Sequence, residues 1–341
     1  MAFLGGRRGL GVLMLALVAV ALLRDHRTSG SIAPVLPQAL AIAINGNLLI
    51  ADRGRNEVLE RAPDGSYVVG VGSGAAGDRG DGSSALQARI DAPTSMAVGG
   101  GGALYFAQAG GAGSAPTVVR EVAPDGAIST VVGAHPDCGA AARSARTIPA
   151  EDAELVAPAL AVASDGRLLL AGRDCPGTLD GGPLLELTAR GSLVDAAAAA
   201  PVAAAGCDPA ALAASPAGTL AIACAGRAPK VLLLSAAGTL RRTLRGVRVS
   251  ALAADPDGAF VAVSATALLR LSRVGAATRL VALGPGSSAA RELGSSAPPA
   301  GVAVARDGDI ELSFSPRRGH SGVAGLVEVG AHGRLHVLWR G

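Results

Sequence analysis

The chain has 341 residues, of which 50% are hydrophobic and 2% are aromatic, and its formal net charge is +3. A charge this close to zero gives no basic footprint for nucleic acid, so the composition excludes a typical nucleic-acid-binding protein. The length also exceeds what one ordinary hydrophobic core supports, which favours a repeat architecture in which each unit packs on its neighbours.

Residues 1–30 have the features of an export segment. Arg7 and Arg8 precede an uncharged apolar run over residues 9–23, and Ala19-Val20-Ala21 has the small-x-small pattern of a cleavage site. This run of about 15 residues is shorter than a membrane-spanning helix needs. We therefore predict a secretory signal peptide, with an uncleaved membrane anchor as the alternative.

Residues 31–341 show no second change in composition and are predicted to form one domain. Removal of residues 1–21, which hold Arg7 and Arg8 and no acid, would lower the net charge from +3 to +1. The expected location is outside the cytoplasm, either secreted or anchored at the outer face of the cytoplasmic membrane. We expect contact with the membrane only through the N-terminal segment.

A strand–turn–strand pattern recurs along this domain. In residues 41–51, AIAINGNLLIA, a glycine separates two apolar runs, which predicts two antiparallel strands joined by a tight turn. The turn glycines of six copies are Gly46, Gly102, Gly166, Gly218, Gly258 and Gly308. Five positions before each glycine stands an alanine: Ala41, Ala97, Ala161, Ala213, Ala253 and Ala303.

Each copy continues into a second pair of predicted strands. The clearest second turns are Pro-Asp-Gly at residues 63–65 and 124–126, because Pro presets φ and Gly accepts a positive φ. Four short strands repeated six times predict an all-β fold, a six-bladed β-propeller of four-stranded blades. A solenoid, or a propeller of five or seven blades, is the alternative.

The first two copies resemble NHL repeats. The resemblance rests on LLIAD at residues 48–52 followed by Asn56 and APDG at 62–65, and on LYFA at 104–107 followed by VREVAPDG at 119–126. The later copies depart from the motif, since Gly172, Cys224, Ser264 and Phe314 stand where Asp52 stands. The resemblance implies a propeller that serves mostly as a binding platform and only sometimes as a lyase.

Long linkers join several copies, at residues 70–92, 133–157 and 284–298. Loops of this length in a compact domain are usually functional or mobile. On a propeller they lie on one face, which makes them the first candidates for partner contact.

Four cysteines in an exported chain favour disulfides. We predict local pairing, Cys138 with Cys175 and Cys207 with Cys224, while the two other connectivities and four free thiols remain open. No pair has the C-x-x-C spacing of a zinc or redox site.

One dense polar cluster follows an inner strand, formed by Asp52, Arg53, Arg55 and Asn56. Arg317 and Arg318 occupy the corresponding place in the last copy. We predict that these residues form a polar rim for a partner. The alternative is that Asp52 only bonds a turn and that the arginines are solvated.

No constellation of residues specifies a chemistry. The histidines outside the N-terminal segment, His135, His320, His332 and His336, fall outside the inner-strand positions, which carry Ala and Leu. No catalytic residue, metal ligand or cofactor is therefore predicted.

The sequence favours a non-catalytic, monomeric binding or scaffolding propeller of the cell envelope or extracellular space, with a protein, peptide or glycan ligand on one face. The scarcity of aromatic residues favours a weak, polar or glycan-directed interface. The alternative is a metal-dependent propeller lyase or lactone hydrolase, and a third possibility is a sensor ectodomain of a larger receptor.

Overall fold

The computed structural model describes residues 32–110, 115–133, 147–153, 155–173, 184–273, 275–284, 286–293, 299–316, 322–330 and 333–341. The chain divides into two compact units, Met1–Ser31 and Ile32–Gly341. The predicted signal or anchor lies outside the described residues. Among the described helices, none has the length and apolar character to span a bilayer. All that follows concerns the unit Ile32–Gly341.

Twenty-four strands of the described chain form six antiparallel blades, each in sequential order from the inner to the outer strand. Blades 1–3 contain β1 (Pro37–Ile42), β2 (Leu48–Asp52), β3 (Glu57–Arg61), β4 (Tyr67–Val71); β5 (Ser95–Val98), β6 (Leu104–Gly110), β7 (Ala115–Val122), β8 (Ile128–Val132); β10 (Val156–Val162), β11 (Leu168–Arg173), β12 (Leu184–Leu187), β13 (Ser192–Asp195). Blades 4–6 contain β14 (Pro209–Ala214), β15 (Leu220–Cys224), β16 (Lys230–Leu234), β17 (Leu240–Arg245); β18 (Ala251–Ala254), β19 (Phe260–Val263), β20 (Ala267–Leu271), β21 (Ala277–Ala282); β22 (Pro299–Val304), β23 (Ile310–Phe314), β24 (Gly325–Val329), β25 (Leu335–Arg340).

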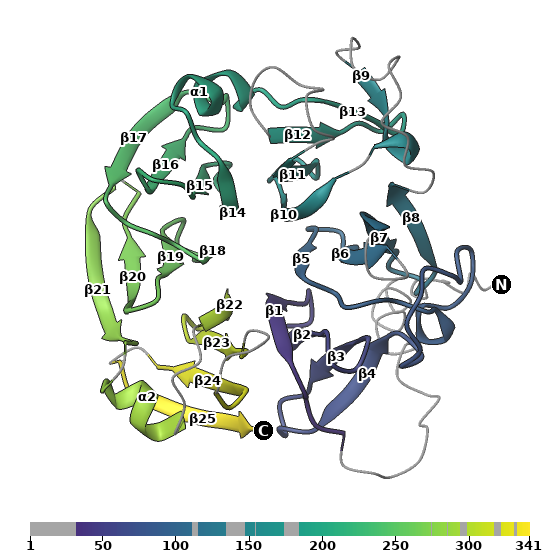
Figure 1. Cartoon of the computed structure of the whole chain (residues 1–341), viewed down its shortest axis with the longest axis horizontal. Helices are drawn as coiled ribbons and strands as arrows, with labels where there is room; N and C mark the ends of the chain where they lie inside the picture. The colour runs from purple at the N-terminus through teal and green to yellow at the C-terminus, as the bar shows by residue number, and fades with distance from the viewer. Residues whose placement is uncertain are drawn as a thin grey trace, which may run out of the picture. The chain divides into compact units, whose positions relative to one another are not determined.

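The blades close into a ring (Figure 1). Inner strands β1, β5, β10, β14, β18 and β22 each contact the next one, and β22 contacts β1. The prediction of an all-β, six-bladed propeller of four-stranded blades is confirmed. Every blade is continuous in sequence, so side-chain packing, and not an exchanged strand, closes the ring between blades 6 and 1.

The repeated turn has the same geometry in all six blades. Gly46 has φ +90° and donates its N–H to the Ala43 carbonyl at 2.9 Å. The other five turn glycines have φ between +79° and +92° and make the same bond to the residue three positions earlier. A residue with a side chain rarely adopts this conformation, which is why the turn requires glycine.

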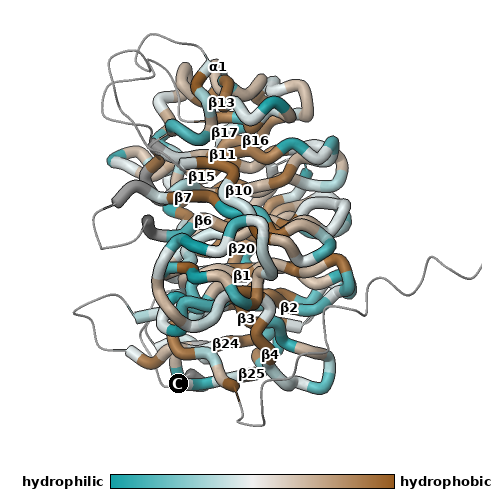
Figure 2. The backbone as a smooth tube through the Cα atoms, turned by 90° about the vertical axis from the view of Figure 1, so that its right-hand side faces the viewer, coloured by the Kyte–Doolittle hydropathy of each residue, from teal (hydrophilic) through white to brown (hydrophobic). Residues whose placement is uncertain are grey.

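Hydrophobic clusters fill the contacts between neighbouring blades. Second strands such as β2 and β15 are buried along their whole length, because both of their faces pack against adjacent blades. Side chains such as Ile50 and Ile222 are fully buried. In side view, hydrophobic colour follows the strands, and hydrophilic colour gathers at the turns (Figure 2).

A few elements lie outside the four-strand pattern. They are β9 (Thr147–Pro149), the 3₁₀ helices η2 (Ala85–Gln87) and η4 (Ala150–Asp152), and the helices α1 (Ala199–Ala204) and α2 (Ser288–Leu293). Strand β9 pairs with β13 as a fifth strand of blade 3, which the sequence pattern did not predict. All of these elements belong to connections between blades.

The two faces of the ring differ. Each inner strand begins at the face where the second strand ends, as the pairing of Pro37 with Asp52 and of Pro209 with Cys224 illustrates. We call this end the mouth face. The connections between blades also begin there, whereas the glycine turns lie on the opposite face.

Candidate functional site

A cavity of about 360 Å³ lies on the axis at the mouth face, and we call it the axial pocket. The first residues of all six inner strands line it, together with Arg53. Towards the opposite face, a second cavity of about 210 Å³ is lined only by Ala, Leu, Ile, Val and Met. The expected Ala and Leu along the axis are therefore present, and the polar side chains of the described lining lie at the mouth.

Hydroxyl groups at the mouth are held by backbone bonds. Ser95 Oγ accepts a hydrogen bond from the Leu160 N–H at 3.1 Å, which leaves its own O–H available to donate. Ser250 Oγ donates to the Val263 carbonyl at 3.2 Å, and Thr94 Oγ1 approaches the Ala107 carbonyl at 3.4 Å. These bonds orient the hydroxyls at the pocket wall before any ligand arrives.

Arg53 is the one charged side chain in the described lining of the axial pocket. Its backbone N–H donates to the Leu36 carbonyl at 3.2 Å, so the residue is anchored at its main chain. No described residue forms an ion pair with its guanidinium, and the neighbouring Asp52 carboxylate is turned towards backbone amides. The pocket therefore has a positive charge at its mouth, suited to a carboxylate or a polarised carbonyl oxygen.

Asp52 is fully buried and organises the loop that carries Arg53. Its carboxylate accepts hydrogen bonds from the N–H groups of Val35 at 2.5 Å, Leu36 at 2.9 Å, Gly54 at 2.9 Å and Arg55 at 3.2 Å. The bonds from Gly54 and Arg55 lie within a turn, as in the alternative weighed from the sequence, whereas those from Val35 and Leu36 come from 17 and 16 residues earlier in the chain. Asp52 is a positioning residue for Arg53.

Arg55 and Asn56 also hold local structure. Arg55 Nε forms an ion pair with Glu57 Oε2 at 2.7 Å. Asn56 has φ +55°, and its Oδ1 accepts the N–H of Ala92 at 3.0 Å, which fastens the linker between blades 1 and 2. Of the predicted rim, Arg53 alone among the described residues reaches the axial pocket, while Arg317 and Arg318 lie outside the described residues.

Three of the polar pocket residues share a repeat position that the sequence reasoning overlooked. Residues three positions before the repeated alanine all line the pocket: Gln38, Thr94, Pro158, Ala210, Ser250 and Ala300. Three of these six are polar, which is unusual on otherwise apolar inner strands. An alignment of the six copies that extended upstream of the alanine would have revealed this signal.

The described residues contain no group of three or more His, Cys, Asp or Glu side chains that is suited to a metal ion. His336 is exposed on the outer strand β25, away from the inner strands. His135, His320 and His332 lie outside the described residues.

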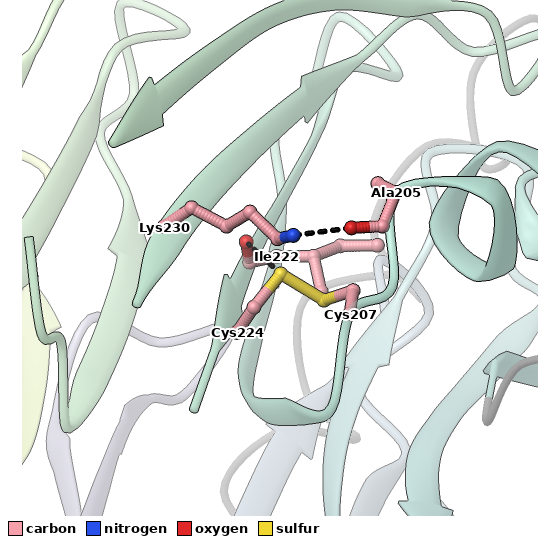
Figure 3. Close-up of a disulfide and its surroundings, with 5 residues drawn as sticks. All are labelled: Ala205, Cys207, Ile222, Cys224 and Lys230. Carbon is pink, nitrogen blue, oxygen red and sulfur yellow. Dashed lines mark hydrogen bonds between the residues drawn. A yellow bond between two sulfur atoms is a disulfide. The ribbon is translucent and has the colours of Figure 1, made fainter. Parts of the chain in front are cut away.

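A disulfide joins Cys207 and Cys224 beside blade 4 (Figure 3). The predicted pairing of these two cysteines is present, while Cys138 and Cys175 lie outside the described residues. Lys230 Nζ donates to the Ala205 carbonyl next to the disulfide (Figure 3). A disulfide favours an oxidising compartment.

Two charged residues are buried between blades. Arg120 is inaccessible and pairs with Asp81 of the linker at 2.5 Å, and Asp81 also accepts the Thr130 N–H at 2.9 Å. Glu311 lies between blades 6 and 1, where burial, followed by repulsion from Glu328, raises its pKa to about 8. Its Oε2 atom has no hydrogen-bond partner among the described residues.

Comparison with known proteins identifies the fold. No protein-family model and no curated protein matches the chain. A solved gluconolactonase from Xanthomonas campestris matches with 16% identity and a TM-score of 0.55, covering 83% of this chain and 84% of that one. A streptogramin B lyase matches with 12% identity and a TM-score of 0.51, covering 84% and 92%.

A third solved structure, the PQQ-bound aldose sugar dehydrogenase from Streptomyces coelicolor, has 14% identity and a TM-score of 0.50 over 91% of this chain and 96% of that one. These likenesses establish the β-propeller fold. The prediction of a non-catalytic binding or scaffolding module is contradicted, because the solved structures that the chain resembles are enzymes.

Proposed function

We propose that this chain is an exported propeller enzyme, a lyase or lactone hydrolase, that binds a small carbonyl-containing substrate in the axial pocket. The observation that carries the proposal is the axial pocket itself, in whose described lining Arg53 is the one charged side chain. The Cys207–Cys224 disulfide supports export. We also propose that the first two blades are NHL-like repeats.

The size and lining of the pocket suit a small molecule. Ligand sites usually enclose about 300–1,000 Å³ and combine apolar walls with a few polar groups, and this pocket has about 360 Å³. The described lining offers a guanidinium and three backbone-anchored hydroxyls over a floor whose side chains are all apolar and whose backbone groups remain accessible. A substrate with one polar, oxygen-rich end and an apolar body fits this distribution.

Both proposed reactions place negative charge on an oxygen. Ester hydrolysis passes through a tetrahedral oxyanion, and elimination next to a carbonyl passes through an enolate. Donors already aimed at that oxygen stabilise it most when water is excluded. We assign this role to Arg53, with the available O–H of Ser95 as a further donor.

The residues present do not fit the metal-dependent form of this chemistry. The described lining of the pocket contains no Asp, Glu, His or Cys, the side chains that hold catalytic metals in proteins. We therefore propose no step through a metal. The role carried by the described residues is substrate binding and stabilisation of negative charge.

The test is turnover of a panel of sugar lactones, aromatic lactones and cyclic depsipeptides by the purified chain and by Arg53→Gln. We expect the substitution to lower kcat/KM by roughly 100-fold, because a hydrogen bond from a charged group contributes about 1.5–3 kcal/mol. Arg53→Lys should recover part of the rate, and Arg190→Gln, an exposed arginine of blade 3, should leave it unchanged. Absence of turnover for the whole panel, or equal rates for Arg53→Gln and the wild type, would overturn the proposal.

A further inference from the structure

The small net charge conceals a strong separation of charge between parts of the ring. Residues 32–208, which include blades 1–3, contain 11 arginines and 19 acids, a net charge of −8. Residues 209–291, which include blades 4 and 5, contain nine arginines, one lysine and two acids, a net charge of +8. One side of the propeller is therefore acidic and the other basic.

The positive charge of blades 4 and 5 lies at the rim. Arg241, Arg242 and Arg245 are exposed on β17, and Arg279 is exposed on β21. These two strands form the outer edge of the ring on the left of Figure 1. Neither strand contains an acidic residue.

One close approach between blades 4 and 5 links the arginines of the two blades. A β-carbon at Gly275, in the turn that leads to β21, would overlap the side chain of Arg242 on β17. Arg273, exposed in the same turn, lies over Gly258. We call Arg241, Arg242, Arg245, Arg273 and Arg279 the arginine band.

The acids of blades 4 and 5 are too few to neutralise this region. Asp255 and Asp257 are the only acids between residues 209 and 291, and both pair with Arg270, at 2.8 and 2.6 Å. Arg270 is not part of the band. Blades 4 and 5 therefore keep a large excess of positive charge, and five of their arginines form the band.

Protection of sheet edges is the ordinary reason for charges on outer strands. It does not account for the band, because β4, the outer strand of blade 1, carries no charged residue. The edge of β8 is covered instead by the linker, where Gly82 and Ser83 exchange backbone hydrogen bonds with Ile128. The chain thus leaves the edge of β4 uncharged and concentrates arginine on adjacent blades. A partner that requires positive charge over a broad area explains this placement better.

We propose that the arginine band binds the surface of an anionic lipid bilayer. Two of the four exposed large hydrophobic residues in the described chain, Leu240 and Leu280, stand next to Arg241 and Arg279, and apolar side chains beside cations suit a lipid headgroup region. No aromatic residue lies on β17 or β21 to stack with nucleic-acid bases. An uncleaved N-terminal segment, the alternative given above, would hold the chain at a membrane.

The experiment is co-sedimentation of the full chain with phosphatidylcholine vesicles, with and without phosphatidylglycerol. The difference between the two vesicle types isolates the contribution of charge, because an apolar N-terminal segment would bind both. We expect Arg241→Gln/Arg245→Gln/Arg279→Gln to lower partitioning to the anionic vesicles by about 100-fold. High salt should lower the partitioning of the wild type to these vesicles as well, because it screens the charges.

The matched control is Arg79→Gln/Arg89→Gln/Arg190→Gln, which removes the same charge from exposed positions in blade 3 and in the linker between blades 1 and 2. An equal loss in this variant would show that total charge, and not the band, is responsible. Three other outcomes would also overturn the proposal: unchanged binding of the band variant, tighter binding of the wild type to duplex DNA than to the vesicles, and salt-sensitive self-association through opposite halves. Circular dichroism confirms that each variant is folded.

Discussion

In blades 1 and 4, two different kinds of bond join the end of the second strand to the segment that precedes the inner strand. In blade 1, Asp52 ends the second strand and pairs with Pro37. Its carboxylate accepts the amides of Val35 and Leu36, which lie 17 and 16 residues earlier in the chain. The segment that enters the inner strand is thereby tied to the end of the second strand.

In blade 4, Cys224 stands at the position of Asp52 and pairs with Pro209. It forms the disulfide with Cys207, which also lies 17 residues earlier. The covalent bond therefore joins the two chain segments that the carboxylate joins in blade 1. This equivalence indicates that the aspartate of the motif is a structural tether at the mouth face.

The largest effect should follow from removal of the tether in blade 1. Asp52→Ala leaves several buried amides without an acceptor, and we expect the free energy of unfolding to fall by about 4 kcal/mol. Asp52→Asn, which keeps one carbonyl oxygen, should lose about half as much. Guanidinium unfolding measures both, and equal stability of Asp52→Ala and the wild type would refute the assigned role.

Removal of the tether in blade 4 should cost slightly less. Cys207→Ser/Cys224→Ser opens a short loop, and we expect a loss of about 3 kcal/mol from the greater freedom of the unfolded chain. A reducing agent should destabilise the wild type more than this variant, in which only the predicted Cys138–Cys175 bond would remain to be reduced. If reduction lowered the stability of both proteins equally, another bond would be responsible.

Glu311 is a second buried carboxylate and differs from Asp52 in its hydrogen bonds. One oxygen of Glu311 has no hydrogen-bond partner among the described residues, whereas the carboxylate of Asp52 accepts several hydrogen bonds. Its pKa is raised from 4.5 to about 8 in the folded chain. The unfolded chain therefore releases this proton first, and stability falls as pH rises from about 4.5 to 8. Glu311→Gln should remove this slope and raise the free energy of unfolding at neutral pH by about 2 kcal/mol.

Unfolding midpoints measured across this pH range test the assignment. Glu292→Gln, which neutralises an exposed carboxylate on α2, is the matched control and should retain the slope of the wild type. A parallel slope in Glu311→Gln would mean that Glu311 is ionised throughout.

The smallest loss of stability is expected from substitutions at the turn glycines of blades 1 and 4. Gly46 in blade 1 has open space where an added β-carbon would stand, so Gly46→Ala should cost only the strain of a positive φ, about 1 kcal/mol. At Gly218 in blade 4, an added β-carbon would lie 2.9 Å from Ala236 Cβ and 3.1 Å from Ser164 Oγ. Gly218→Ala should therefore lower the thermal midpoint further, and the reverse order would contradict the packing of blade 4.

Local patterns in the sequence determined the architecture. The turn glycines and the alternation of apolar residues act within a few positions, so each copy predicts its own four strands, and six copies predict a ring. The same locality explains the pairing of Cys207, just before β14, with Cys224, at the end of β15. Strand β9 escaped prediction because its partner is β13, the outer strand of blade 3, and not a neighbouring segment of the sequence.

The tertiary structure decided what the polar residues do. Asp52 and Arg53 are neighbours in sequence, yet one is buried against backbone amides and the other lines the axial pocket. Gln38, Thr94 and Ser250 come together only because ring closure brings the starts of distant inner strands to one axis. The net charge does not show where the charged residues lie. The ring places the acidic blades 1–3 and the basic blades 4 and 5 on opposite sides. Periodicity and turn chemistry are local properties, and the pocket and the charge separation depend on contacts between residues far apart in the chain.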